Sequence, residues 1–376
     1  MRSFNVTGVC IPEKHYMVDV SARVQNIKAT LVSPGQYFTI NRARQYGKTT
    51  TLYMLEKALQ SEYAVISLSF EAADDLFQSR YHFAIGFIKK VSKRLKVLGV
   101  ESNIVQEWEK SISKEMPFED LNDRITALCQ SCSKKIVLML DEVDKSSDNQ
   151  IFLSFLGLLR TKYLELQKGE DDTFFSVILA GVYDIKNLKL KYRTGEEEKY
   201  NSPWNVAADF DVDMSFSAND IATMLEVYEQ DHHTGMVISA IANELYAYTS
   251  GYPYLVSRLC QLIDENMQDG ISWNHQGILA AVRLLLKDKN TLFDDIQKKL
   301  TDFPQLRDML YAMLFQGITY PYHAYSNIIS VGESVGFIKE RNNQVVVANR
   351  IYEMWIYNLF IAEDSLHDKT IVEVVV

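Results

Sequence analysis

Short apolar runs and longer stretches of helical periodicity alternate along the first half of the chain. An apolar run of about four to eight residues, bounded by turn residues, is typical of a strand buried in a parallel sheet. Such runs predict five strands, at residues 37–40, 63–70, 136–140, 174–181 and 210–216. Helical spacing predicts a helix before the first strand, at residues 21–31, and between later strands a long helical region at residues 75–132 and a helix at residues 151–167. Strands that alternate with helices predict an α/β fold with a parallel sheet.

The second half of the chain is mainly helical in pattern. Helices are predicted at residues 218–230, 234–249, 253–268, 275–288, 292–301, 304–315 and 325–335. Two short strands follow, at residues 337–340 and 344–348, and the polar residues 341–343 between them are a hairpin signal. A final helix carries Tyr352, Trp355 and Phe360. Helices followed by a small hairpin favour a winged-helix module at this end of the chain.

The composition limits the class of protein. The chain has 376 residues, 47% of them apolar, and a net charge of −10, which argues against a basic nucleic-acid footprint over the whole surface. Cys129 and Cys132 have C-x-x-C spacing without a second pair, so a buried pair on a helix is favoured over a metal or redox site. The N-terminus lacks the apolar core of a secretory leader, and no apolar run approaches membrane-spanning length. We therefore expect a cytoplasmic protein that contacts no membrane.

The sequence Gly47-Lys48-Thr49 stands between the first predicted strand and a helical pattern. Strand, loop, Gly-Lys-Thr and helix form the context of a phosphate-binding loop. In such a loop the helix N-terminus attracts the anion, Lys48 reaches the β- and γ-phosphates, and the Thr49 hydroxyl contacts Mg²⁺. The full pattern has glycine five residues before Gly47, where this chain has Arg42, so an ordinary helix start in a basic loop would look the same. The predicted nucleotide contacts are Arg44, Gln45, Tyr46, Gly47, Lys48, Thr49 and Thr50.

A second candidate feature ends the apolar run at residues 136–140, where Asp141 and Glu142 follow directly. Open α/β sheets bind their ligands at the carboxyl ends of the strands. Asp141 is predicted to hold Mg²⁺ through water, because Mg²⁺ gives up its water reluctantly, and Glu142 to polarise an attacking water. A strand that ends in a solvated acidic turn would give the same pattern. The correct order of the two motifs in one chain favours a P-loop NTPase.

Four stretches together resemble the bacterial AAA-like P-loop ATPases, which are related to archaeal-type predicted ATPases and to signalling NTPases with numerous domains. These stretches are residues 41–49, 140–142, Ser202-Pro203-Trp204-Asn205 and Gly251-Tyr252-Pro253-Tyr254, and the resemblance extends from about residue 5 to 362. Members carry an Arg-x-Arg-Gln-x-Gly-Lys loop, which Arg42 and Arg44 match.

The resemblance implies a three-layer core with sheet order 5-1-4-3-2, a helical lid and a C-terminal winged helix. The domains would span residues 1–216, 217–290 and 291–376. ATP would be the nucleotide and Glu142 the catalytic glutamate, with Lys48 also acting in catalysis. Pro253 would lie near the adenine or the phosphates as a sensor in the lid, and Arg258 would approach a phosphate.

The function predicted from these features is a slow, Mg²⁺-dependent ATPase that acts as a molecular switch. Its lid and winged helix would relay the nucleotide state to a protein partner or to a second copy of the chain. Arg160 and Arg193 are candidates for an arginine that a neighbouring subunit supplies, although both suit a surface role. Residues 183–184 are candidates for sensing the γ-phosphate. His15 and Tyr16 are candidates for stacking on the base, with surface packing favoured, and the apolar residues 371–376 are a candidate for strand addition.

Two alternatives remain at this point. One is an ATP-regulated DNA-binding or defence component that uses the winged helix. Its recognition region, residues 324–335, has no arginine or lysine, and the wing offers only Lys339, Arg341 and Arg350, so a protein partner is favoured. The other alternative is a nucleotide-binding module without hydrolysis, against which Glu142 argues.

Overall fold

The computed structural model describes residues 2–71, 74–143, 150–182 and 204–367. The chain forms two compact units. The first, here called the helical unit, comprises Met1–Asp19, Arg42–Thr50 and Asp213–Val376. The second, here called the sheet unit, comprises Val20–Asn41 and Thr51–Val212. Each unit is described by itself.

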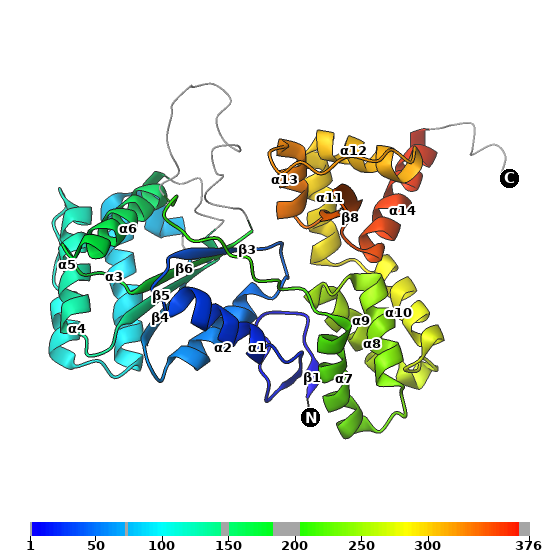
Figure 1. The fold of residues 1–376 in the computed structure, drawn as a ribbon, viewed down its shortest axis with the longest axis horizontal. Helices are drawn as coiled ribbons and strands as arrows, with labels where there is room; N and C mark the ends of the chain where they lie inside the picture. Colours follow the sequence, from blue (N-terminus) through cyan, green and yellow to red (C-terminus); the bar gives the residue numbers. More distant parts are fainter. Residues whose placement is uncertain (1, 72–73, 144–149, 183–203, 368–376) are drawn as a thin grey trace. The chain divides into compact units, whose positions relative to one another are not determined.

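A parallel sheet of four strands is the centre of the sheet unit (Figure 1). The strands are β3 (Phe38–Asn41), β4 (Ala64–Ser69), β5 (Ile136–Asp141) and β6 (Ser176–Gly181). They pair in the order β3-β6-β5-β4. Asn41 pairs with Gly181, and Ser69 pairs with Asp141, so the carboxyl ends of all four strands lie at one edge. The prediction of a parallel α/β sheet is confirmed.

Helices cover both faces of this sheet (Figure 1). Side chains of α3 (Arg80–Val97), α5 (Pro117–Ser131) and α6 (Gln150–Lys168) form one core cluster with every second residue of β4 and β5. Helix α1 (Ser21–Ile27) and the following π-helical turn (Lys28–Val32) lie along the other face, with the part of α2 from Thr51 onward. All six residues of β5 and all six of β6 are buried, which explains their continuous apolar runs.

The prediction of a fifth strand at residues 210–216 is wrong. The sheet order 5-1-4-3-2 is therefore not confirmed. Within residues 204–216, the β-pairing with the sheet is limited to an isolated bridge between Ala208 and Phe38. Aspartates alternate through this stretch, and the carboxylate of Asp213 accepts hydrogen bonds from the amide and hydroxyl of Ser215. Such local bonds compete with a strand ladder.

The long helical region predicted at residues 75–132 is divided into several helices. A 3-10 turn (Asp74–Gln78), α3, α4 (Ser102–Trp108) and α5 divide this region. Gly99, with a φ of 70°, ends α3 in a left-handed conformation, and Pro117 occupies the first turn of α5. Glycine suits this conformation and proline suits a first helical turn, so both residues mark helix boundaries.

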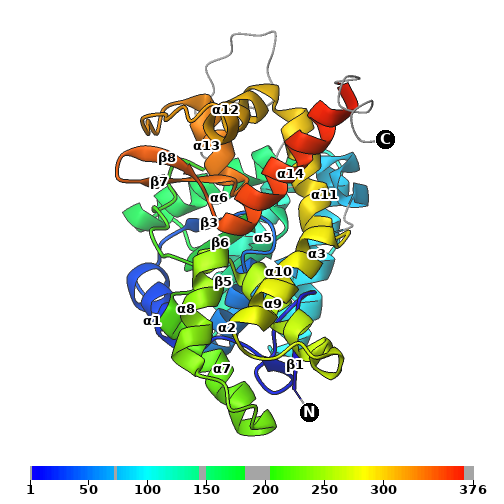
Figure 2. The ribbon, with the colours of Figure 1, turned by 90° about the vertical axis from the view of Figure 1, so that its right-hand side faces the viewer.

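Most of the helical unit consists of two groups of elements (Figure 2). The first group is α7 (Ala218–His232), α8 (Ile238–Thr249), α9 (Pro253–Glu265) and α10 (His275–Lys287). The second group is α11 (Thr291–Asp302), α12 (Pro304–Phe315), α13 (Asn327–Ser334), β7 (Ile338–Arg341), β8 (Gln344–Val347) and α14 (Arg350–His367). The predicted hairpin is confirmed, since β7 and β8 pair antiparallel and Asn342 and Asn343 have φ of 54° and 61°.

Two short strands near the N-terminus were not predicted. Strands β1 (Ser3–Phe4) and β2 (His15–Tyr16) pair in parallel within the helical unit. Tyr16 is buried, and its hydroxyl bonds to Asp231 at 2.9 Å and to His232 at 3.0 Å, while His15 accepts a hydrogen bond from the amide of Ile11. Tyr16 thus anchors the N-terminal segment to α7 instead of packing on the surface.

Candidate functional site

The loop of residues 42–47 connects β3 to the first residue of α2 (Lys48–Leu59). Gln45 and Gly47 have φ of 55° and 80°, which places both in the left-handed region. Glycine adopts this region at no steric cost, whereas a glutamine there costs about 1–3 kcal/mol and is held by its surroundings. The loop is therefore strained at one position, next to the first residues of a helix.

Lys48 lies folded over this loop. Its ammonium donates hydrogen bonds to the carbonyl oxygens of Arg42 at 2.8 Å and Ala43 at 2.9 Å. The first amides of a helix have no intrahelical acceptors, and the helix dipole adds a partial positive charge there. A lysine charge and helix amides together make a site for an anion.

The two threonines that follow Lys48 differ in their surroundings. Thr49 is exposed in the first turn of α2. The Thr50 hydroxyl accepts a hydrogen bond from the amide of Cys10 at 3.1 Å. Thr50 therefore ties the N-terminal segment to the loop, a contact that the sequence did not suggest.

In the sheet unit, Asp141 and Glu142 lie where β5 ends. Asp141 is 8% exposed, and one of its carboxylate oxygens accepts a hydrogen bond from the backbone amide of Glu142 at 2.9 Å. Glu142 is half-buried and has a φ of 58°, an uncommon conformation for a residue other than glycine. Backbone strain of this kind concentrates at functional positions, so Glu142 is the second strained candidate residue after Gln45.

Two residues at the start of α9 lie against the loop, whereas Arg258, farther along the helix, contacts α9's neighbouring elements instead. Pro253 is the first residue of α9, and its ring carbons lie 4.0 Å from the point where a Cβ on Gly47 would stand. Tyr252 is buried, and its hydroxyl donates to the carbonyl oxygen of Arg44. Arg258, by contrast, donates to the carboxylate of Asp288 at 2.8 Å and so serves the packing of α9 against α10.

The second group of the helical unit also contacts the loop. The guanidinium of Arg44 lies 3.3 Å from the carboxylate of Asp295 in α11, and the Gln45 amide lies 3.4 Å from the Thr291 hydroxyl. A Cβ on Gly336 would stand 2.7 Å from the Cβ of Ala43. No sequence pattern indicated these contacts, because the partners lie far apart in the sequence, for example 251 residues for Arg44 and Asp295.

The remaining candidates are placed as follows. Arg160, on α6, donates to the side-chain oxygen of Asn205 at 2.8 Å. Residues 183–184, Arg193 and residues 371–376 lie outside the described residues. Burial raises the pKa of both Cys129 and Cys132, which favours inert thiols.

Among the described residues, no group of three or more acidic, histidine or cysteine side chains could hold a metal ion. This finding is compatible with Mg²⁺, which binds through one or two protein oxygens, water and the phosphates of a nucleotide. The Asp141 carboxylate and the Thr49 hydroxyl have the appropriate oxygen chemistry. In the same described ranges, no helix is long and apolar enough to cross a membrane.

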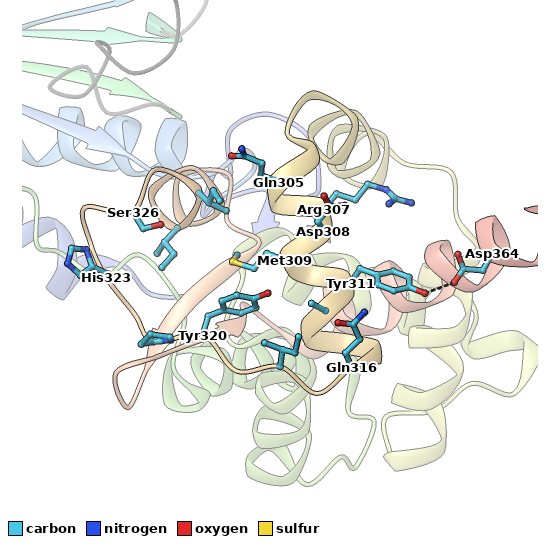
Figure 3. Close-up of a pocket in the computed structure, with 15 residues that line it drawn as sticks. Gln305, Arg307, Asp308, Met309, Tyr311, Gln316, Tyr320, His323, Ser326 and Asp364 are labelled. Atoms are coloured by element: carbon cyan, nitrogen blue, oxygen red, sulfur yellow. Dashed lines mark hydrogen bonds between the residues drawn. The ribbon is translucent and has the colours of Figure 1, made fainter.

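A separate hollow of about 990 Å³ lies beside α12 (Figure 3). Its lining comes from α12, from residues 316–329 and from Asp364, whose carboxylate accepts the Tyr311 hydroxyl at 3.0 Å. None of the loop residues 42–50 lines it. Its polar groups are dispersed, and Arg307 is paired with Glu363 outside the lining. The hollow therefore offers no convergent chemistry.

Comparisons with known proteins agree with this architecture. Residues 8–358 match the model of the AAA-like domain. The Walker-type ATPase of Pyrococcus abyssi is similar in structure, with a TM-score of 0.61, 13% identity and coverage of 94% of this chain and 99% of that one. The ORC2 protein of Aeropyrum pernix, in ADPNP and ADP complexes, has a TM-score of 0.52 and 11% identity, with coverage of 92% and 94%. No curated protein matches the chain.

Proposed function

Because this chain belongs to the AAA-like domain family, we propose that it binds ATP with Mg²⁺ at residues 44–50 and hydrolyses it slowly as a molecular switch. The observation that carries the proposal is the Lys48 ammonium, held 2.8–2.9 Å from two carbonyl oxygens of a loop that opens a helix. These carbonyls hold the Lys48 ammonium within the loop, where it would contact a bound phosphate.

Four of the candidate residues have defined roles in the proposed reaction. Phosphoryl transfer depends mainly on positioning and on neutralising the charge of the phosphates. Lys48 and the first amides of α2 bind the phosphates, while Thr49 and Asp141, the latter through water, hold Mg²⁺. Bound Mg²⁺ supplies further positive charge to the phosphate oxygens. Glu142 accepts a proton from the attacking water.

Slow turnover follows from the loop's limited set of cations. Arg44 is paired with Asp295, and Arg160 is bound to Asn205, so neither is aimed at a phosphate by its described contacts. A neighbouring subunit that supplies an arginine would therefore raise the rate, as such arginines do in related phosphoryl-transfer systems.

The elements from α11 to α14 are proposed to act as a winged helix that relays the nucleotide state to a protein partner or a second copy. Residues 217–290 would form the lid, and residues 1–216 the core. The contacts of Ala43, Arg44 and Gln45 with this C-terminal region support a relay, since a change in the loop reaches the region directly.

DNA binding is the less favoured use of these elements. Helix α13 has no basic residue. Arg350 lies over the ring of Tyr248 at 5.0 Å, and burial lowers the pKa of the half-buried Lys339. Arginines and lysines on phosphates supply much of the affinity for DNA. These elements therefore suit a protein surface better than a duplex.

The test measures ATP binding by calorimetry and phosphate release with Mg²⁺. We expect Lys48→Ala to weaken binding at least tenfold, and Lys57→Ala, which changes an exposed lysine of the same helix, to leave binding unchanged. Glu142→Gln should abolish turnover but keep binding. Glu170→Gln, at an exposed position, should change neither turnover nor binding. Equal binding by wild type and Lys48→Ala would refute the site.

A second measurement tests the switch. Light scattering of the wild-type chain, with and without ATP, is expected to show a change of particle mass. An unchanged mass together with normal hydrolysis would contradict nucleotide-dependent self-association and leave a protein partner as the receiver of the signal. Titration with duplex DNA at low salt, with and without ATP, is expected to show no shift.

A further inference from the structure

Two surfaces that the proposed ATPase site does not use carry opposite charges. One lies on α3 in the sheet unit (Figure 1), and the other is the hollow beside α12 in the helical unit (Figure 3). Both combine charged side chains with exposed apolar ones, and apolar surface rimmed by polar groups marks sites of protein interaction. The two surfaces are therefore candidates for contact between separate copies of the chain.

The surface on α3, here called the α3 stripe, consists of Lys89, Lys93 and Val97. These residues follow one another at intervals of four, so they lie on the same side of the helix. All three are exposed, and Val97 is 69% exposed. No described residue forms a hydrogen bond or an ion pair with the side chain of either lysine. The stripe thus presents two cations and an apolar side chain to solvent.

The cations that alternate with this stripe are used inside the sheet unit. Lys90 donates a hydrogen bond to a backbone carbonyl oxygen at 3.1 Å, and Arg94 and Lys96 form ion pairs with glutamates. By their described contacts, Lys89 and Lys93 are therefore the lysines of this part of α3 that remain for an acidic partner outside the unit.

The hollow beside α12 has an acidic rim. Asp308 and Asp364 line it, and both are exposed. No described residue pairs with the carboxylate of Asp308, and the carboxylate of Asp364 accepts the Tyr311 hydroxyl at 3.0 Å. Arg307 also lines the hollow, but its ion pair with Glu363 neutralises its charge. The rim therefore carries an excess of negative charge.

Apolar surface lies next to this rim. Ile329 is a buried part of the lining, whereas Ile318 is 43% exposed. Tyr325, which stands between the lining residues His323 and Ser326, is 94% exposed. Tyrosine is enriched among the residues that supply the binding energy of protein interfaces. The hollow therefore has the composition of a docking surface, and its dispersed polar groups suit a helix better than a small ligand.

We propose that the α3 stripe of one copy docks against the hollow of a second copy. The two lysines pair with the two carboxylates of the rim, and Val97 covers part of the apolar lining. Lysines one helical turn apart have Cβ atoms about 6 Å from each other, so they reach two acidic groups that are spread over a rim. Opposite charges also select this contact over one between like-charged surfaces. This inference rests on the proposed function, because it identifies the second copy as the receiver of the signal.

The position of the hollow connects docking to the nucleotide. The hollow is lined by α12 and by other residues of the C-terminal region, and this region contacts the loop of residues 42–47 through Arg44 and Asp295. A phosphate that disturbs this ion pair therefore acts on the region that holds the hollow. The docking affinity is expected to differ between the free and the nucleotide-bound chain, as a switch requires.

The test measures particle mass by light scattering, with and without a non-hydrolysable ATP analogue and Mg²⁺. Lys89→Glu/Lys93→Glu reverses the charge of the α3 stripe, and Asp308→Lys/Asp364→Lys reverses that of the rim. Either variant alone is expected to associate at least about tenfold more weakly than the wild type, because like charges then face each other. An equimolar mixture of the two variants is expected to regain the wild-type mass, because each reversed surface finds its opposite on the other variant.

Two controls separate charge at the interface from other effects. Glu226→Lys/Glu353→Lys makes the same change of net charge as the rim variant at exposed positions outside the hollow, and it should leave association unchanged. Tyr311→Phe removes a hydrogen bond at the rim but keeps the charge, and it should also leave association unchanged. If a double variant fails to fold, the single reversals Lys93→Glu and Asp308→Lys should reproduce the pattern with smaller effects.

Variants that associate like the wild type, or a mixture that stays as weakly associated as its components, would overturn this docking. A wild type that keeps the mass of one copy with and without the analogue would also overturn it and leave the hollow to a partner of another kind. These results leave the proposed ATPase untouched. Absence of analogue binding by the wild type would instead overturn the proposed function, while recovery of association in the mixture would still support the docking.

Discussion

Gly336, just before β7, gives a test of whether the C-terminal region shapes the phosphate-binding loop. Its φ is 78°, and a Cβ there would stand 2.7 Å from the Cβ of Ala43 in the loop. Alanine in the left-handed region costs about 1–2 kcal/mol. Overpacking of a buried contact adds about 1–3 kcal/mol. We therefore expect Gly336→Ala to lower the free energy of unfolding by about 2–5 kcal/mol.

The chain offers a matched control for the backbone term. Gly235 has a φ of 75°, and a Cβ there would meet nothing within 4 Å. Gly235→Ala should therefore cost only the backbone strain, about 1–2 kcal/mol. Both variants are unfolded in urea. If the free energy of unfolding falls with urea at the same slope in both, the difference between their stability losses is the contribution of the contact with Ala43.

The loop contact also predicts an effect on function. The Ala43 carbonyl accepts a hydrogen bond from Lys48, so displacement of Ala43 disturbs the ammonium that would bind phosphate. Gly336→Ala should weaken ATP binding several-fold, and Gly235→Ala should not. Ala43→Gly in the Gly336→Ala background should restore binding and recover the part of the stability loss that comes from the contact, while the backbone strain of about 1–2 kcal/mol remains. If the two glycine variants lose equal stability and bind ATP equally well, the reasoning about this contact is refuted.

Further predictions concern stability. Lys162→Met should cost about 3–5 kcal/mol in urea denaturation, because it leaves Asp171 partly buried without its partner. Burial raises the pKa of Asp171, but hydrogen bonds from Lys162 and Thr126 outweigh it and lower the pKa below its ordinary value. This stabilisation is therefore present above about pH 4 and is lost as the pH falls through the folded pKa, and Lys162→Met should reduce that acid dependence. Ser217→Ala, which removes the capping box of α7, should lower the free energy of unfolding by about 1 kcal/mol in the same assay.

The sequence predicted the parallel strands well because their physics is local. Residues 136–140 are apolar at every position, and the structure buries all six residues of β5. Residues 210–216 are also rich in apolar side chains, but Asp213 between them bonds locally to Ser215, and no strand forms there. A count of apolar positions does not register that competition, which explains the wrong fifth strand.

The candidate site was predictable to a different extent at each residue. The left-handed φ of Gly47 follows from its residue type in a turn before a helix. The left-handed φ of Gln45 and Glu142 does not, because glutamine and glutamate adopt it only when tertiary contacts hold them there. The Thr50 contact with Cys10 likewise depends on an N-terminal segment whose strands of two residues have no periodicity to detect.

The contacts of the loop with α11 predict a coupling between ATP binding and the binding of a partner. Arg44 is bound to Asp295, and a phosphate in the loop would compete with this carboxylate for the same guanidinium. Coupling between two binding events is reciprocal, so a partner that draws α11 away from Arg44 must change ATP affinity by the same factor by which ATP changes affinity for that partner. Asp295→Asn, which keeps the shape but removes the charge, should therefore raise ATP affinity and reduce the coupling. An unchanged affinity in calorimetry would show that the ion pair serves only packing.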